Sequence, residues 1–249
     1  MINTNSKGIF FSLINYWIKY LHTIWVLRIK NINSYLRKSD KSYVRFIILC
    51  TARSGSTWLH TLLNSHPNIH SKGEITLIHH DQSIQDYAYT TYPLSIHAVG
   101  LKVFYDDDSY QEALNSIKKD KGIRVIHLVR NNLTEQFISY KKALTSGEWS
   151  FRTNSKSSKI KIDTYELLEY QKKQKILRNQ VNIDLNNHNL IEIVYEDLIK
   201  QTNHETSKIQ NFLEVGQKKL FSILKKQSTK PLRSQVENWE ELVHKGCDL

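Results

Sequence analysis

Apolar residues gather into four short, nearly continuous runs from residue 43 onward, and longer stretches of mixed polarity separate these runs. Runs without a polar residue at every second position are typical of strands that are buried on both faces of a parallel sheet. They cover residues 43–50, 98–104, 123–129 and 190–195. We predict that these segments are the strands of a parallel sheet.

The stretches between the runs have helical patterns. Two of them start with the spacing of a capping box, Ser109 with Glu112 and Asn132 with Glu135. The predicted helices cover 56–65, 109–119, 132–146 and roughly 162–188, with shorter helices in the last fifty residues. Strands that alternate with helices indicate an α/β chain. We therefore expect a three-layer, P-loop-like fold in which helices flank a central, mostly parallel sheet.

An apolar segment at residues 8–29 precedes the first predicted strand. It is long enough to span a bilayer, but polar residues recur in it at every third or fourth position, which is typical of an amphipathic helix. We interpret residues 1–40 as an amphipathic helical extension and residues 41–249 as one globular domain. Three placements remain open for 8–29: packing on the domain or a partner, peripheral contact with a membrane, and a span that leaves the domain cytoplasmic.

The composition narrows the choice of partner and compartment. Lys and Arg outnumber Asp and Glu by 35 to 24, and the net charge of +11 favours an anionic ligand, a nucleic acid or an acidic membrane surface. The two cysteines, Cys50 and Cys247, provide no disulfide framework and no paired-cysteine metal spacing. The pattern of a cleavable signal peptide is also missing. These features predict a cytoplasmic protein, which is membrane-associated if residues 8–29 contact a membrane.

The loop after the first predicted strand, "TARSGST" at residues 51–57, has the composition of an anion-binding loop. Gly55 permits a close approach, and backbone N–H groups at the start of the next helix would point at one spot. The loop lacks the GxxxxGK[ST] spacing, which disfavours hydrolysis of a nucleoside triphosphate. Arg53 stands in place of the usual lysine, beside the hydroxyls of Ser56 and Thr57. The alternative is an ordinary turn in which Ser and Thr cap the helix.

A second segment, "VIHLVRNNLTEQFISY", places Arg130 at the end of a predicted strand and Ser139 on the following helix. The two side chains can meet near a second anion site. Two separate sites imply a ligand with separated phosphates. The alternative makes Arg130 a sheet-edge ion pair and Ser139 a residue of the helix surface.

These two segments resemble the sulfotransferases that use 3′-phosphoadenosine 5′-phosphosulfate (PAPS). "TARSGSTW" is similar to their 5′-phosphosulfate loop, and Arg130 with Ser139 is similar to their 3′-phosphate site. The likeness is closest to bacterial and Golgi-type carbohydrate sulfotransferases, including glycolipid and nodulation-factor enzymes. In those enzymes RSGS or RTGT is followed by a helix, by "HP" at 66–67 here, and then by a glutamate, Glu74 here. The likeness covers roughly residues 44–242, including "VYEDL" and "ENWEEL". Arg130 and Ser139 are nine residues apart, where cytosolic members have eight, and Asn131 stands where carbohydrate-type members often have arginine.

The resemblance implies roles for individual residues. Arg53 would bind the donor and neutralise charge on its bridging oxygen as the S–O bond breaks. Glu74 would accept the proton of the acceptor hydroxyl as general base, with His70, His79 and His80 as rival bases. No metal is expected. The donor-binding residues implied by the resemblance are Arg53, Ser54, Gly55, Ser56, Thr57, Trp58, Arg130 and Ser139.

Three further features allow two interpretations each. Trp58 either stacks on the adenine or packs in the core. Lys102 either reaches the sulfuryl group or the acceptor, or is a strand-end lysine that extends its ammonium to solvent, which we favour. The acidic run at 106–108 is interpreted as a turn rather than a metal site.

Taken with the resemblance, the sequence predicts a PAPS-dependent sulfotransferase of the EC 2.8.2 type, with residues 41–249 as its catalytic domain. The acceptor would be a hydroxyl of a carbohydrate or glycolipid, and no nucleic acid is expected as partner. The alternative is a non-enzymatic basic module that binds nucleic acid or an anionic membrane. An atypical kinase would require magnesium and ATP, which the missing lysine disfavours. Acceptor specificity would reside in 75–97, 147–160 and the C-terminal region, and the oligomeric state is not encoded in any motif.

Overall fold

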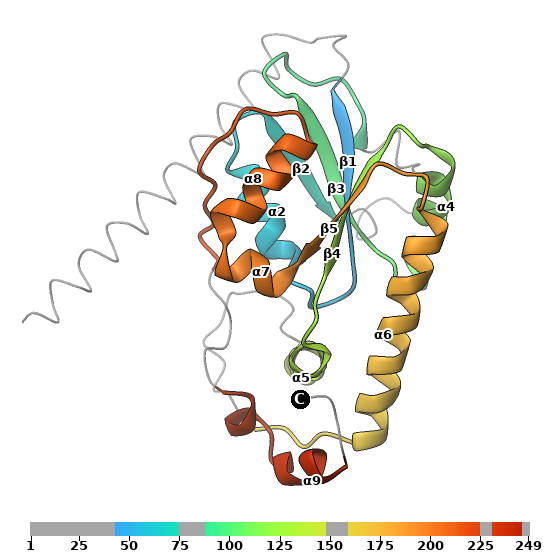
Figure 1. Ribbon diagram of the computed structural model, residues 1–249, viewed down its shortest axis with the longest axis vertical. Helices are drawn as coiled ribbons and strands as arrows, with labels where there is room; N and C mark the ends of the chain where they lie inside the picture. The colour runs from blue at the N-terminus through green and yellow to red at the C-terminus, as the bar shows by residue number, and fades with distance from the viewer. Residues whose placement is uncertain (1–42, 75–87, 148–158, 225–230, 246–249) are drawn as a thin grey trace, which may run out of the picture.

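The computed structural model describes residues 43–74, 88–147, 159–224 and 231–245, and these form an α/β fold around one five-stranded sheet (Figure 1). The strand order is β2-β3-β1-β4-β5, and every neighbouring pair is parallel. The expected fold, a parallel sheet flanked by helices, is thereby confirmed. The strands are β1 (Val44–Cys50), β2 (Ile69–Glu74), β3 (Ala98–Phe104), β4 (Arg124–Val129) and β5 (Leu190–Val194).

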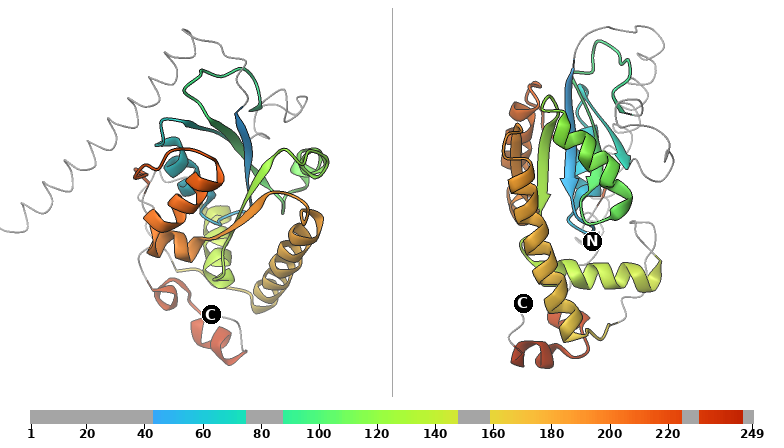
Figure 2. Two further views of the ribbon diagram at one scale, coloured as in Figure 1. Left: turned by 45° about the horizontal axis from the view of Figure 1, so that its top comes forward. Right: turned by 90° about the vertical axis from the view of Figure 1, so that its right-hand side faces the viewer.

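Helices cover both faces of the sheet (Figures 1 and 2). The α2, α7 and α8 helices pack on one face and share a core with alternate residues of β1, whereas α4 and α6 pack on the other face. The α5 helix lies beyond the carboxyl ends of the strands and crosses their direction. The helices are α2 (Ser56–Asn64), α4 (Gln111–Lys119), α5 (Leu133–Ser146), α6 (Thr164–Asp184), α7 (Tyr195–Lys200), α8 (Thr202–Phe212) and α9 (Trp239–His244), with short 3₁₀ turns η1 (Asp108–Tyr110) and η2 (Leu232–Gln235).

The central strand β1 shows why its sequence lacks polar alternation. Phe46, Ile48 and Cys50 face the α2 side, while Ile47 and Leu49 face the α4 and α6 side, and all five are fully buried. A strand with a core on each face requires apolar residues at every position. The same pattern predicted β3, β4 and β5 to within one residue at each end.

The edge strand β2 was not predicted from the sequence. Its sequence, IHSKGE, is mostly polar because only Ile69 and Ser71 are buried. Among the strands that the structure describes, β2 pairs with β3 alone, and the register shifts between Ser71 and Glu74. This pairing brings Glu74 opposite Lys102, at the carboxyl edge of the sheet.

One of the two predicted helix caps is confirmed and the other is wrong. The Asn132 side chain accepts a hydrogen bond from the Glu135 N–H at 2.7 Å and caps α5. Ser109 does not cap a helix. Instead, the Asp107 carboxylate accepts from the Ser109 N–H at 2.9 Å and starts the turn η1, which leads into α4. The acidic run 106–108 therefore includes a turn, as expected.

Several expectations concern residues outside the described part of the chain. These are the amphipathic extension and its membrane contact through residues 8–29, the boundary at residue 40, Cys247 and the rival bases His79 and His80. Within the described residues, no helix combines the length and hydropathy needed to cross a bilayer.

A histidine in the core makes stability depend on pH. His127 on β4 is fully buried, 3.3 Å from the Tyr105 hydroxyl and 3.7 Å from a Glu192 carboxylate oxygen, and burial lowers its pKa to about 4. The unfolded chain therefore binds this proton more readily than the folded protein does. We expect His127 to remove about 3 kcal/mol from the free energy of unfolding as pH falls from about 6.5 to about 4.

Denaturant titrations of the wild type and His127→Gln at several pH values measure this effect. The variant should lose stability less steeply over the same pH range. Identical slopes in the two proteins would contradict a neutral, buried His127.

Candidate active site

The candidate site lies at the carboxyl ends of β1, β3 and β4, where such sheets commonly bind ligands. Its first part is residues 51–57, which we call the anion loop. Gly55 has φ of 91° and precedes α2, so that the last two residues of the anion loop, Ser56 and Thr57, start this helix. The first N–H groups of an α-helix have no acceptor within the helix and carry a partial positive charge. The loop therefore directs backbone donors toward one anion.

The side chains of Asp106 and Gln136 form hydrogen bonds with the first two residues of the anion loop. The Asp106 carboxylate accepts from the Ala52 N–H at 3.2 Å, and the Gln136 amide donates to the Ala52 carbonyl at 2.7 Å and to the Thr51 hydroxyl at 2.8 Å. Arg53 then adopts φ of 61°, a left-handed conformation that is costly for a residue with a side chain. These contacts stabilise the strained turn. Neither Asp106 nor Gln136 was assigned to the site from the sequence.

The first turn of α7 closes the loop from another side. A Cβ atom on Gly55 would overlap Cδ2 and Cε2 of the Tyr195 ring, so that the ring lies directly against the Gly55 backbone. Trp58 packs edge-on to the same ring, with centroids 6.5 Å apart, and also contacts the buried core on the α2 side of the sheet. Only glycine provides both the space and the backbone conformation needed at position 55.

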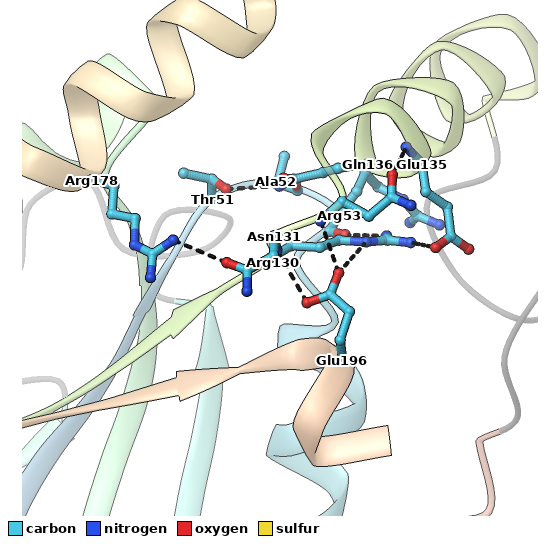
Figure 3. Close-up of polar contacts among 10 residues, drawn as sticks. Thr51, Ala52, Arg53, Arg130, Asn131, Glu135, Gln136, Arg178 and Glu196 are labelled. Atoms are coloured by element: carbon cyan, nitrogen blue, oxygen red, sulfur yellow. Dashed lines mark hydrogen bonds and ion pairs between the residues drawn. The ribbon is translucent and has the colours of Figure 1, made fainter. Parts of the chain in front are cut away.

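The second part of the site brings Arg53, Arg130 and Ser139 together. Figure 3 shows the two arginines side by side. The Arg130 side chain is only 5% exposed, and its Nη1 donates to the Arg53 carbonyl at 3.0 Å. The Arg53 Nε donates to the Ser139 hydroxyl at 2.9 Å. Ser139 is half-buried on α5, and this hydrogen bond links it to the anion loop. Arg130 also forms an ion pair with Glu135, but both guanidinium groups lie in one region.

The electrostatics of this region favour an anion. Burial, followed by the Arg130 charge, lowers the pKa of Arg53, although an arginine stays protonated at any physiological pH. A phosphate that binds both guanidinium groups would offset the electrostatic repulsion between them. Arginine is suited to this because its planar fork matches the oxygens of a phosphate.

A third group of residues lies at the β2 end of the site. The Lys102 ammonium is 2.7 Å from a Glu74 carboxylate oxygen and 3.4 Å from the Thr57 hydroxyl of the anion loop. Lys102 is only 3% exposed, so the favoured interpretation of a lysine extended to solvent is wrong. A buried ammonium requires such partners. Glu74, Lys102 and the anion loop thus form one continuous polar edge.

The rival base His70 lies elsewhere. It pairs with Val99 in the register of β2 and β3, whereas Glu74 pairs with Lys102 at the opposite end of β2. Its ring packs against Tyr92 at a centroid distance of 5.2 Å. His66 of the "HP" pair is buried, and its Nε2 is 2.7 Å from the Gly216 carbonyl oxygen, which indicates a structural role. In the part of the chain that the structure describes, no group of three or more His, Cys, Asp and Glu residues could hold a metal ion.

Comparison with known proteins adds evidence on the family. A family model described as "Sulfotransferase family" matches residues 122–218, a range that includes Arg130, Ser139 and Tyr195. Nodulation protein H of Rhizobium tropici is 26% identical over 220 residues, which is 79% of this chain and 87% of the relative. Nodulation protein H of Rhizobium meliloti (strain 1021) is 25% identical over 221 residues, 79% of this chain and 89% of the relative.

Solved structures of two sulfotransferases also match. A sulfotransferase from Alicyclobacillus acidocaldarius aligns with 15% identity and a TM-score of 0.48, over 84% of this chain and 98% of that one. The sulfotransferase domain of the Synechococcus PCC 7002 olefin synthase aligns with 17% identity and a TM-score of 0.39, over 81% of this chain and 84% of that one. The chain is thus similar to sulfotransferases over residues 122–218, and to nodulation protein H over 79% of its length.

Proposed function

We propose that this enzyme transfers a sulfuryl group from PAPS to a hydroxyl of a carbohydrate or glycolipid acceptor. The observation that carries the proposal is the convergence of Arg53, Arg130 and Ser139 beside the anion loop. A bisphosphorylated nucleoside needs two anion sites in one region, and this region offers them. The similarity of residues 122–218 to the sulfotransferase family model disfavours the alternative of a non-enzymatic basic module.

Each end of the donor has its own set of groups. The N–H groups of Gly55–Thr57 face the 5′-phosphosulfate, whereas the Ser54 N–H donates to the Thr51 carbonyl at 3.3 Å. The guanidinium groups of Arg53 and Arg130 with the Ser139 hydroxyl hold the 3′-phosphate. Because the Arg53 side chain extends toward Ser139, we assign charge compensation at the sulfuryl end to Lys102, beside Thr57. Trp58, half-buried beside the loop, borders the nucleoside.

Glu74 acts as general base in this proposal. Its carboxylate accepts the proton of the acceptor hydroxyl while the acceptor oxygen forms a bond to sulfur and the S–O bond to the 5′-phosphate breaks. Lys102 orients Glu74 through the 2.7 Å ion pair. As Glu74 takes up the proton, the Lys102 ammonium becomes available to the negative charge that develops on the leaving phosphate. Glu74, Lys102 and Thr57 of the anion loop lie along one edge of the sheet, so that the base and the cation are both close to the proposed site of the sulfuryl group.

The relatives support an oligosaccharide acceptor. They are nodulation proteins H, and the chain resembles nodulation-factor sulfotransferases in the spacing of RSGS, "HP" and Glu74. We therefore place short oligosaccharides and glycolipids with a free hydroxyl first among acceptors. Cytoplasmic localisation and a peripheral membrane contact through residues 8–29 remain proposals of the same kind.

Transfer of labelled sulfate from PAPS to a panel of sugars and glycolipids tests the proposal. With an acceptor that the wild type sulfates, Glu74→Gln should lower turnover by about 100- to 10,000-fold, because the general base is lost. Its dissociation constant for adenosine 3′,5′-bisphosphate should stay within about threefold of the wild type, because Glu74 does not contact the 3′-phosphate site.

Glu112→Gln is the matched control, since Glu112 is an exposed carboxylate on α4. It should turn over like the wild type. Unchanged turnover in Glu74→Gln would remove Glu74 as the base. Failure of the wild type to bind adenosine 3′,5′-bisphosphate at one saturable site would contradict the proposed function itself.

A further inference from the structure

Glu196, in the first turn of α7, binds the backbone that follows Arg130 (Figure 3). One carboxylate oxygen accepts from the Asn131 N–H at 3.1 Å, and the other accepts from the Asn132 N–H at 3.0 Å. The oxygen that binds Asn132 also lies 4.0 Å from the Arg130 Nε. One side chain therefore fixes two consecutive peptide groups and a guanidinium.

These peptide groups form the turn between β4 and α5. Arg130 precedes the turn, and α5, which carries Ser139, follows it. The turn is also held from its far side, because Arg178 of α6 donates to the Asn131 side-chain oxygen at 3.1 Å. The relative position of Arg130 and Ser139 depends on this turn, so a contact that fixes it also fixes the spacing between them.

The neighbouring residue connects the same helix turn to the anion loop. The Tyr195 ring lies against Gly55 on one side, and the Arg130 guanidinium lies 4.7 Å from the ring centroid. The first turn of α7 therefore contacts both anion sites. It can set the distance between them, which must match the distance between the two phosphates of a nucleoside 3′,5′-bisphosphate.

We propose that Glu196 is a positioning residue for the 3′-phosphate site, which orients Arg130 and the β4–α5 turn without touching the donor. This inference rests on the proposed function. It explains why an acidic side chain lies next to a site for an anion.

The hydrogen bonds of Glu196 and Arg130 indicate that the Glu196 carboxylate does not compete with a bound phosphate for Arg130. Both Glu196 oxygens are engaged by backbone N–H groups, so the carboxylate belongs to the frame of the site. Arg130 uses Nη1 for the Arg53 carbonyl and Nη2 for Glu135, and among the described residues its buried Nε has no hydrogen-bond acceptor. Each Nη carries a second N–H, and these two can bind one phosphate in the bidentate manner of guanidinium groups.

Comparison of two nucleotides tests the proposal. Calorimetric titrations give the dissociation constants of adenosine 3′,5′-bisphosphate and of adenosine 5′-phosphate. The ratio of the two constants measures how much the 3′-phosphate contributes to affinity. In Glu196→Gln one backbone N–H loses its acceptor and Arg130 loses a nearby charge. We expect the bisphosphate to bind about tenfold more weakly and the monophosphate to bind within twofold of the wild type.

Asp197→Asn is the matched control, because Asp197 is an exposed acid in the same helix turn. It should leave both dissociation constants unchanged. If Glu196→Gln does not fold, Glu196→Asp keeps the charge but shortens the reach to the N–H groups, and it should reduce the same ratio.

The other outcomes overturn the inference. Equal weakening of both nucleotides would mean that Glu196 supports the fold in general, and tighter binding of the bisphosphate would mean that the carboxylate competes with the phosphate. If the wild type prefers the bisphosphate and Glu196→Gln has the same ratio of dissociation constants, the positioning role of Glu196 is rejected and the proposed function stands. A wild type without that preference would reject the proposed function, and this inference with it.

Discussion

Replacement of Arg130 by alanine should raise the dissociation constant for adenosine 3′,5′-bisphosphate by about 100-fold or more. The guanidinium offers two N–H groups to the 3′-phosphate, and each hydrogen bond to a charged group contributes about 1.5–3 kcal/mol. The loss also leaves Glu135 and Glu196 near each other without their cation. Because the Arg130 side chain is only 5% exposed, we expect the free energy of unfolding to fall as well, by roughly 3 kcal/mol.

Two further variants separate binding from folding. Arg130→Lys keeps a cation between the two carboxylates, so it should fold, but it lacks the planar fork and should bind the bisphosphate at least about tenfold more weakly. Arg124→Ala removes an arginine from the opposite end of β4, where it forms an ion pair with Glu214, and should leave nucleotide binding within about twofold of the wild type. Wild-type affinity in Arg130→Ala, measured by calorimetry, would contradict the assignment of the 3′-phosphate site.

Gly55→Ala should disrupt both the fold and the site. The new Cβ would overlap the Tyr195 ring, and φ of 91° is strained for any residue with a side chain. We expect the free energy of unfolding to fall by about 3 kcal/mol. Nucleotide binding should become undetectable, since the loop cannot keep both its turn and its contact with Tyr195. Denaturant titration and calorimetry measure the two effects.

Gly147→Ala is the matched control for backbone strain. Gly147 has φ of 70° after α5, and no atom of the described residues lies within 4 Å of a Cβ built there. This variant should lose only about 1 kcal/mol of stability and should bind nucleotide normally. Equal loss of stability in the two variants would show that strain, and not the contact with Tyr195, makes glycine necessary at position 55.

The buried strands could be predicted from the sequence because their environment leaves a local signal. β1 and β3 have cores on both faces, so their sequences are apolar at nearly every position. β2 has one partner among the described strands and few buried residues, and nothing in IHSKGE separates it from a loop. That omission affected the site, because without β2 there was no reason to place Glu74 beside Lys102.

The residues of the candidate site also divide into those that a local sequence pattern indicates and those that only tertiary contacts bring to the site. The composition of the anion loop and the position of Arg130 at a strand end are local features, and they led to the two anion sites. Gln136 contacts the anion loop from 84 and 85 residues away along the chain, and Glu196 contacts the turn after β4 from 64 and 65 residues away. Tyr195 lies against Gly55, which is far earlier in the sequence. No local pattern reports such contacts. "VYEDL" was noted as part of the family likeness, but its contacts with the β4–α5 turn and with Gly55 depend on the tertiary structure.

A crystal structure of the enzyme with adenosine 3′,5′-bisphosphate tests the central claim most directly. We expect the 5′-phosphate to accept hydrogen bonds from backbone N–H groups of Gly55–Thr57, and the 3′-phosphate to lie between the guanidinium groups of Arg53 and Arg130 and the Ser139 hydroxyl. A nucleotide bound elsewhere, or one whose 3′-phosphate points to solvent away from Arg130, would contradict it.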